Sequence, residues 1–526
     1  MKNAASPVFS PLRQWLYALP DRLQRGPSAL LLCALAGALG VLSFAPLERF
    51  WLMPFLLALL FHLLRRADNW RQAAWRATLF GLGLFLAGVS WVYVSMYVYG
   101  GLSMVMAALP TLLLCFILAT GHPMLGGLFH YYMPETPGRQ ALFFALLWAS
   151  IDLLRGWAFT GFPWLALGYS QTPPSPLAGF APILGVYGVS FFTALVSAWL
   201  VCGSRKRPWP WIAALFVLLA GWGLRHYAWT TPVGAPIRVA LIQGNIAQGQ
   251  KWRPENFIYT LNLYRDLITQ NPAQLTVLPE TAIPVFYDNI DKDYLRELKS
   301  LAMRENGNLV MGVLTRADAK TYWNSAVSLG VSPSQGYSKA HLVPFGEYAP
   351  FGFDWFLNIP MASFSSGPIR QPPLELTGQK IAVNICYEDL FGHTLSAPLP
   401  EATLLVNMSN TAWFGRSLAQ SQHLQIARLR ALETGRTMLR ATNTGMTAVI
   451  TPDGMVEDVL PQFTVGVLKA TVRGHAGSTP YILWGDGGVT LLILLALYAS
   501  LRKGRKTKAR EADGGRAANP SAAPVR

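Results

Sequence analysis

The sequence predicts an α-helical membrane bundle of about eight transmembrane helices joined to a layered α/β domain. Of its 526 residues, 52% are hydrophobic and only 13% are charged, and the mean hydropathy is +0.30. These values lie outside the usual range of soluble globular proteins. Apolar stretches fill the first 229 residues, whereas residues 237–471 contain short β-rich runs and helical patterns. We therefore expect a membrane protein that carries one large polar domain.

Eight apolar stretches approach the roughly 20 residues that a helix needs to cross a hydrocarbon core. They cover residues 30–45, 51–64, 77–98, 103–119, 141–154, 182–202, 209–229 and 482–501. The second and fifth are short and also fit a buried, tilted or re-entrant helix. A cleaved signal peptide is an alternative for the first stretch. Another apolar run begins at Trp51 almost at once, which favours an anchor helix.

Lysine and arginine cluster beside alternate apolar stretches. The clusters precede the first stretch and follow the second, fourth, sixth and last: Lys2, Arg13, Arg22, Arg25; Arg65, Arg66, Arg71, Arg76; Arg139; Arg205, Lys206, Arg207; Arg502, Lys503, Arg505, Lys506. Cytoplasmic loops carry such an excess, so both termini are expected in the cytoplasm and residues 230–481 outside it. The net charge of +16 then indicates topology rather than nucleic-acid binding. Residues 502–526, basic and then rich in Ala, Gly and Pro, are expected to be disordered.

Residues 230–481 are expected to form the polar domain. Its β-rich runs cover residues 237–243, 275–280, 309–314, 325–329, 381–386, 404–407 and 447–451. Helical patterns lie between several of them, at residues 256–269, 294–305 and 421–434. Strands that alternate with helices predict an α/β sandwich or layered α/β domain. Functional residues in such folds lie just past the carboxyl ends of strands.

Three predicted strand ends or adjacent loops carry chemically unusual residues, namely Glu280, Lys339 and Cys386. Each has an ordinary explanation: an exposed or helix-capping carboxylate, a solvated loop lysine and a small buried thiol. Together they supply what covalent acyl transfer requires. A carboxylate takes the proton of the thiol, the sulfur attacks a carbonyl, and an ammonium stabilises the oxyanion.

The motifs around these residues resemble the nitrilase superfamily. They are Cys386-Tyr387-Glu388, the turn Gly346-Glu347-Tyr348 after the lysine, and the segment 410–415, Asn-Thr-Ala-Trp-Phe-Gly. Five further motifs resemble the apolipoprotein N-acyltransferases, the membrane members of that superfamily, and the likeness covers nearly the whole chain. These motifs occupy residues 155–157 (Arg-Gly-Trp), 161–164 (Gly-Phe-Pro-Trp), 168–171 (Gly-Tyr-Ser-Gln), 243–246 (Gln-Gly-Asn-Ile) and 251–252 (Lys-Trp).

The resemblance implies an αββα nitrilase domain on a transmembrane bundle, with the roles of individual residues carried over by motif. Cys386 would be the nucleophile, Glu280 the general base and Lys339 the electrostatic partner of the tetrahedral intermediate. Supporting and substrate-binding roles would fall to two further groups: Glu347, Tyr387 and Glu388 for support, and Trp252, Trp413, Trp157 and Phe345 for the substrate entrance.

The resemblance also implies the reaction and its location. An acyl chain, typically the sn-1 chain of phosphatidylethanolamine, would move to the α-amino group of the N-terminal S-diacylglyceryl cysteine of an apolipoprotein. The enzyme would lie in the bacterial inner membrane with its catalytic domain in the periplasm. No cofactor or metal is expected, and His341, His393 and His423 show no metal-ligand spacing.

Three alternatives stay open at this point. The loop 345–364, rich in Phe and Trp, fits either a membrane-facing lid or a segment packed on its own domain. A membrane-tethered amidase or nitrilase would use the same triad, with water as the acceptor. A transporter or receptor is disfavoured, because the apolar stretches hold few charges, of which Asp152 is the clearest, whereas transport pathways usually need more.

Overall fold

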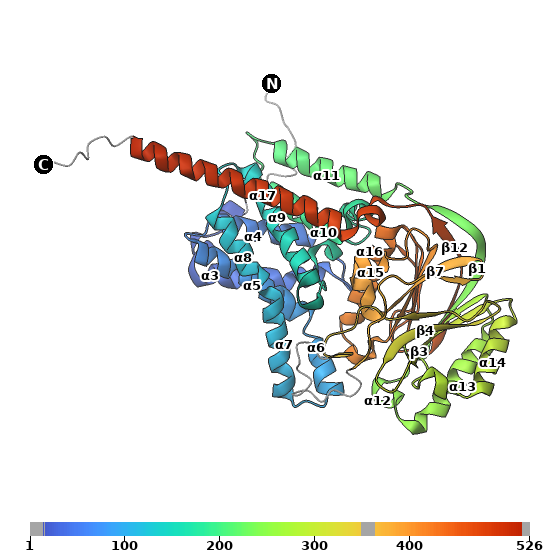
Figure 1. The fold of residues 1–526 in the computed structure, drawn as a ribbon. Helices are drawn as coiled ribbons and strands as arrows, with labels where there is room; N and C mark the ends of the chain where they lie inside the picture. The colour runs from blue at the N-terminus through green and yellow to red at the C-terminus, as the bar shows by residue number, and fades with distance from the viewer. Residues whose placement is uncertain (1–13, 15, 349–362, 518–526) are drawn as a thin grey trace.

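The computed structural model describes residue 14, residues 16–348 and residues 363–517, and it has two parts (Figure 1). A bundle of helices forms one part, and a β-sandwich flanked by helices forms the other. The chain builds the bundle first, then the sandwich, and returns to the bundle in its final helix α17. The two parts predicted from the hydropathy pattern are therefore both present.

Every apolar stretch predicted from the sequence lies on a helix. The bundle comprises α2 (Asp21–Gln24), α3 (Gly26–Gly40), α4 (Leu52–Arg65), α5 (Trp70–Gly88), α6 (Val92–Val94), η2 (Ser95–Tyr99), α7 (Met104–Ala119), α8 (Gly121–Tyr131), α9 (Pro137–Trp157), α10 (Ala181–Cys202), α11 (Trp209–Arg225) and α17 (Pro480–Ala517). Within the described residues, five segments are long and apolar enough to cross a membrane, and there are six if α5 and Val92–Tyr99, which are bent by 51°, are counted as one span. The shorter α4 and α11 are apolar too, so a count of eight spans stays a prediction.

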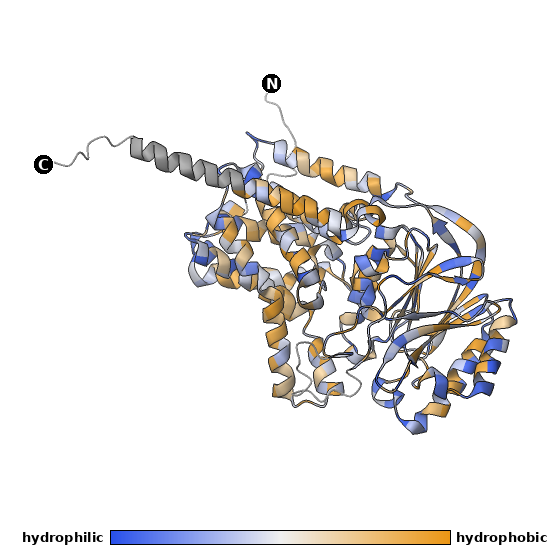
Figure 2. Cartoon of the chain, viewed as in Figure 1, coloured by the Kyte–Doolittle hydropathy of each residue, from blue (hydrophilic) through white to orange (hydrophobic). Residues whose placement is uncertain are grey.

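Several bundle helices expose apolar side chains on their outer surfaces. Figure 2 shows apolar residues along α7, α11 and the first part of α17. Phe116 on α7, Phe216 on α11 and Leu495 on α17 are among the exposed large side chains. Apolar surface of this extent is unfavourable in water and is suited to contact with lipid acyl chains.

The second part is built from two six-stranded sheets. The first has the order β12-β1-β2-β3-β4-β5 and the second β11-β10-β9-β8-β7-β6. The strands of the first are β1 (Thr231–Gln243), β2 (Leu275–Val277), β3 (Asn308–Arg316), β4 (Tyr322–Gly330), β5 (Gly336–Ser338) and β12 (Gly466–Ala476). Those of the second are β6 (Leu374–Leu376), β7 (Gln379–Ile385), β8 (Leu404–Ser409), β9 (Met438–Thr442), β10 (Ala448–Ile450) and β11 (Val456–Val459).

The sheets pack face to face, and helices cover their outer faces. Apolar residues of both sheets, such as Val277 and Val406, share one buried cluster. On the outside of the first sheet lie α13 (Pro254–Gln270) and α14 (Lys292–Met303). On the outside of the second lies α16 (Ala419–Thr434). The αββα arrangement expected from the resemblance is confirmed.

Helix α16 joins the two parts of the molecule. All of its residues are buried. Leu424 and Ala427 pack with residues of the second sheet, whereas Ile426 and Leu429 belong to the large apolar cluster of the bundle. Helix α16 therefore has no polar face toward solvent, and its sequence lacks the one-sided apolar pattern of a surface helix.

The expectations for the C-terminal tail, residues 502–526, and for the aromatic loop, residues 345–364, fall partly outside the described residues. Disorder of residues 502–526 stays a prediction, although α17 continues to Ala517. Residues 502–517 are rich in Lys and Arg and contain three Ala, residues that favour helix and can extend a helix that has already formed. Residues 518–526 and most of the expected lid, residues 349–362, lie outside the described residues.

Candidate active site

The proposed catalytic residues meet at one edge of the sandwich. Strands β1, β2 and β3 are parallel, and two antiparallel steps through β4 give β5 the same direction. Glu280 follows β2, Lys339 follows β5, and Cys386 follows β7 of the facing sheet. Carboxyl ends of strands thus deliver all three groups, as the sequence pattern predicts.

The Lys339 ammonium is shared by two carboxylates. Its Nζ lies 2.9 Å from Glu347 Oε1 and 3.4 Å from Glu280 Oε1. Burial alone would lower the pKa of Lys339, but the carboxylates of Glu347 and Glu280 outweigh it and raise that pKa above its ordinary value. Lys339 is therefore a permanent positive charge in the site.

Two N–H donors, the side chain of Asn324 on β4 and the backbone of Asn410 after β8, orient the Glu280 carboxylate. Asn324 Nδ2 donates to Glu280 Oε1 at 2.8 Å and to Glu347 Oε1 at 3.0 Å. The backbone N–H of Asn410 donates to Glu280 Oε2 at 2.8 Å. These donors hold Glu280 in one orientation beside the thiol.

Cys386 is partly buried and stands at the sharp turn where η8 (Cys386–Leu390) begins after β7. Its φ of 55° lies in the left-handed region that is rare for residues other than glycine. Burial, reinforced by the Glu280 carboxylate and opposed by Lys339, raises the pKa of the Cys386 thiol well above its ordinary value. The thiol therefore rests in its neutral form, and in the predicted role of nucleophile it would have to lose its proton to a base as it attacks.

Glu388 forms hydrogen bonds both to the loop that carries Lys339 and to the turn that carries Cys386. Its carboxylate accepts hydrogen bonds from the Tyr337 hydroxyl at 2.9 Å, from the backbone N–H groups of Ala340 and His341 at 2.7 and 3.0 Å, and from that of Ile385 at 2.7 Å. Burial raises the pKa of Glu388 to about 7, against the effect of these N–H donors. One carboxylate thus connects the segments that carry Lys339 and Cys386.

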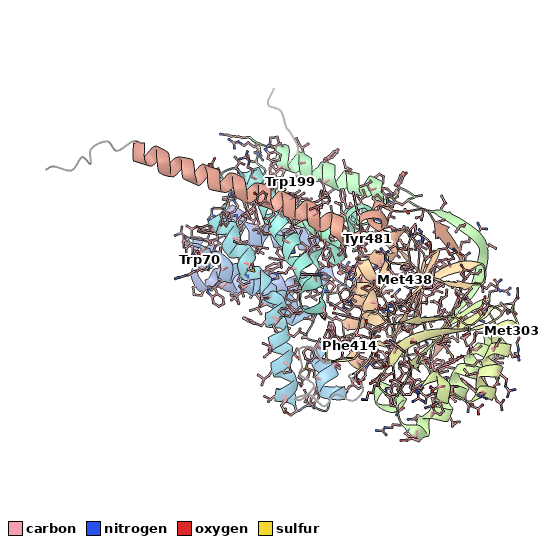
Figure 3. All side chains as sticks on the ribbon, viewed as in Figure 1. Trp70, Trp199, Met303, Phe414, Met438 and Tyr481 are labelled. Atoms are coloured by element: carbon pink, nitrogen blue, oxygen red, sulfur yellow. The ribbon has the colours of Figure 1, made fainter. Side chains whose placement is uncertain are left out.

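Tyr387 connects the site to the helix bundle. Its hydroxyl donates to the Gly161 carbonyl oxygen at 2.8 Å, in the turn that follows α9. The ring of Phe414, labelled in Figure 3, comes from η9 (Thr411–Phe414) and packs against Trp91 of the bundle at 4.5 Å between centroids. The site therefore lies against the bundle and not at the far side of the sandwich.

The four residues predicted at the substrate entrance are exposed. Trp157 ends α9 next to the Gly161 turn, and its side chain is 80% exposed. Trp413 on η9 meets Tyr99 of the bundle edge to face. Trp252 and Phe345 are also exposed large side chains. Roles in substrate binding remain a prediction for all four.

Some residues of the site were not predicted from the sequence. Asn324, Tyr337 and Lys251 are buried around the catalytic carboxylates, yet each lies in a segment whose pattern indicates only a strand or a loop. Asn410 and Lys251 do stand inside motifs that carried the resemblance.

Asp152, the clearest charge in the apolar stretches, pairs with Arg155 at 2.9 Å and accepts from Leu167 N and Ser190. This pairing explains its burial without a transport pathway.

The chain matches two family models. The apolipoprotein N-acyltransferase N-terminal domain matches residues 36–199, and carbon-nitrogen hydrolase matches residues 238–481. An apolipoprotein N-acyltransferase of Nitrosomonas europaea is 46% identical over 88% of this chain and 96% of the relative. Those of Ralstonia nicotianae and Chromobacterium violaceum are each 44% identical, over 92% and 90% of this chain and 96% and 94% of the relatives.

Proposed function

The chain belongs to the apolipoprotein N-acyltransferase family, and we propose from this that it moves an acyl chain from a phospholipid to the N-terminal cysteine of apolipoproteins through a thioester on Cys386. One observation carries the mechanism. A buried carboxylate, a buried ammonium and a partly buried thiol converge at the edge of the sandwich that packs on the apolar bundle. This placement brings covalent acyl chemistry to the surface of a membrane, where both substrates reside.

The first half-reaction forms the thioester. Cys386 attacks the ester carbonyl while Glu280 takes the thiol proton, because the raised pKa of Cys386 disfavours a free thiolate. Lys339 stabilises the oxyanion of the tetrahedral intermediate. The C–O bond then breaks, and the lysophospholipid leaves as an alcohol with the proton that Glu280 returns.

The second half-reaction forms the amide. The neutral α-amino group of the acceptor cysteine attacks the thioester, Glu280 accepts a proton from the nitrogen, and Cys386 leaves and is reprotonated. The amide product is lower in free energy than the thioester, so no nucleotide is needed. Keeping water off the thioester directs the acyl group to the amine rather than to hydrolysis.

The membrane is part of the proposal. Exposing an acyl chain to water would cost about 0.8 kcal/mol for each CH₂ group. We propose the inner membrane as the location, the periplasm for the catalytic domain, and phosphatidylethanolamine, through its sn-1 chain, as the donor. Trp252, Trp413, Trp157 and Phe345 would line the entrance, which their exposure permits.

The test follows the acyl group through both halves. Incubation with phosphatidylethanolamine alone is expected to leave one acyl chain on Cys386, seen by intact and peptide mass spectrometry and removed by neutral hydroxylamine. Cys386→Ala should carry none, and Glu280→Gln should acylate far more slowly because the neutral thiol loses its base.

Adding a diacylglyceryl peptide should then move the chain to the peptide amine. Free fatty acid released over many turnovers, with no standing adduct, would instead identify a hydrolase. No adduct in any condition would remove Cys386 as the nucleophile.

A further inference from the structure

A second lysine is buried beside the proposed base. Lys251 ends the short helix α12 (Gln248–Lys251), and its side chain is almost fully buried. The ammonium donates to the Glu280 carbonyl oxygen at 3.1 Å and to Thr281 Oγ1 at 2.5 Å. Among the described residues, no carboxylate lies within 4.0 Å of it. Lys251 is thus a buried cation held by neutral oxygens.

Such an arrangement destabilises the fold. A buried charge loses hydration that two neutral acceptors replace only in part. Burial accordingly lowers the pKa of Lys251 to about 8, although Glu280 and Cys386, the titratable groups that face it, act in the opposite direction. A methionine would fill the same space without this penalty, so packing alone does not account for a lysine here.

Lys251 holds the backbone from which Glu280 projects. Thr281, the next residue, is β-branched and has a φ of 43°, which is strained for such a side chain. On the opposite side, Gly312 of β3 leaves room for the turn, since a Cβ there would lie 2.8 Å from Glu280 Cα. Contacts from α12 and β3 therefore confine a turn whose conformation is unfavourable by itself.

Helix α12 also supports the carboxylate end of Glu280. Gln248 Oε1 accepts from Asn410 Nδ2 at 2.8 Å, and the Asn410 backbone donates to Glu280 Oε2. Trp252, at the predicted entrance, follows directly after Lys251. One short helix thus contacts the backbone of Glu280 directly and its carboxylate through Asn410, and an exposed aromatic side chain follows it.

We propose that Lys251 is a positioning residue that fixes the Glu280 turn, and with it the base, against Cys386. The inference rests on the proposed function, in which Glu280 takes the thiol proton. Lys251 contacts neither the Glu280 carboxylate nor the sulfur within hydrogen-bonding distance, so it acts through the backbone of Glu280. Its charge adds a favourable field for the carboxylate and for a developing thiolate.

The experiment compares Lys251→Met with Lys299→Met, an exposed lysine on α14, in the detergent-purified full chain. Lys251→Met is expected to slow single-turnover acylation by phosphatidylethanolamine on the order of 100-fold, because a small displacement of a catalytic group has that effect. The KM should stay unchanged. At pH 7 the Tm should stay equal or rise. Below about pH 8 the buried Lys251 of the folded protein is mostly protonated, and the burial of this charge destabilises the fold, so removing it by substitution should not lower the Tm. Lys299→Met should match the unchanged chain in all three.

The pH profile separates positioning by the ammonium from packing. The acylation rate of the unchanged chain should fall as the pH rises through about 8, where Lys251 loses its proton, and Lys251→Met should lack this decline. Thr281→Val, which keeps the lysine and removes one acceptor, should slow acylation by a smaller factor and serves as the test if Lys251→Met does not fold.

Acylation by Lys251→Met at the rate of the unchanged chain would overturn the proposal, as would a fall in Tm that parallels the loss of rate. If the unchanged chain itself forms no adduct on Cys386, the proposed function fails instead, so the two failures are distinguishable.

Discussion

The surroundings of Lys339 restrict the shape of its side chain as well as its charge. Its ammonium is almost fully buried and lies within 3.4 Å of two carboxylates. An ammonium is a compact donor on a flexible stem, whereas a guanidinium is a planar fork of different reach. The identity of the cation, and not only its charge, should therefore matter.

We expect Lys339→Arg to lower the rate of Cys386 acylation on the order of 100-fold or more although the positive charge is kept, because the guanidinium cannot fit between Glu280 and Glu347 without displacing the base. Acylation with phosphatidylethanolamine, followed by mass spectrometry, measures the effect. Lys320→Arg, at an exposed position, is the control. Substantial retained activity would mean that Lys339 supplies bulk charge alone.

At the scale of secondary-structure elements, the close approach of β3 to the turn after β2 determines the position of Glu280. Gly312 on β3 faces the turn after β2, and a Cβ there would approach Pro279 O to 2.3 Å and Thr281 N to 2.5 Å. Both contacts are to backbone atoms, which cannot rotate away. The strand β3 therefore sets the depth at which Glu280 projects.

Gly312→Ala should displace the Glu280 turn. We expect a loss of about 1–3 kcal/mol in the free energy of unfolding from overpacking, together with a fall in acylation rate on the order of 100-fold. Gly336→Ala on β5 is the matched control, since its nearest neighbour would be Ala326 O at an ordinary 3.5 Å. Denaturant unfolding and single-turnover acylation give the two readings. An unimpaired rate in Gly312→Ala would contradict this account of the turn.

At the scale of the whole molecule, the sandwich contacts the bundle at the edge that carries the proposed catalytic residues. Helix α16 is buried between the second sheet and the bundle, and the Tyr387 hydroxyl reaches the turn at Gly161. A soluble hydrolase tethered by one helix would need neither contact. The attachment suits a substrate that never leaves the membrane.

The distribution of lysine and arginine predicts how the molecule lies across that membrane. A reporter fused after Arg526 should behave as cytoplasmic. A reporter inserted at Lys320, which is exposed between β3 and β4, should behave as periplasmic. Alkaline phosphatase and green fluorescent protein activities read the two sides. Both reporters on the same side would exclude a single membrane span between the sandwich and the C-terminus, and with it the eight-helix topology.

Much of this protein could be read from the sequence because the signals are local. A bilayer requires long apolar helices, and a buried strand requires a short apolar run, so hydropathy located eight of the apolar helices and seven of the strands but missed the apolar helix α8 that follows α7. The three proposed catalytic residues could be singled out because each stands near a predicted strand end or in a local motif. The αββα fold came from resemblance rather than from periodicity.

Contacts between distant segments could not be read in this way. Strand β12 pairs with β1 across more than two hundred residues of sequence. Strand β9 contains the buried Arg440, and a charged residue is not expected in a core strand. Its ion pair with Asp389, which explains the burial, is visible only in the structure. Helix α16 lacks a one-sided pattern because it is buried on both sides. Lys251 is an ordinary lysine in the sequence. Only packing, which removes water from it and places it against Glu280, makes it a buried cation beside the base.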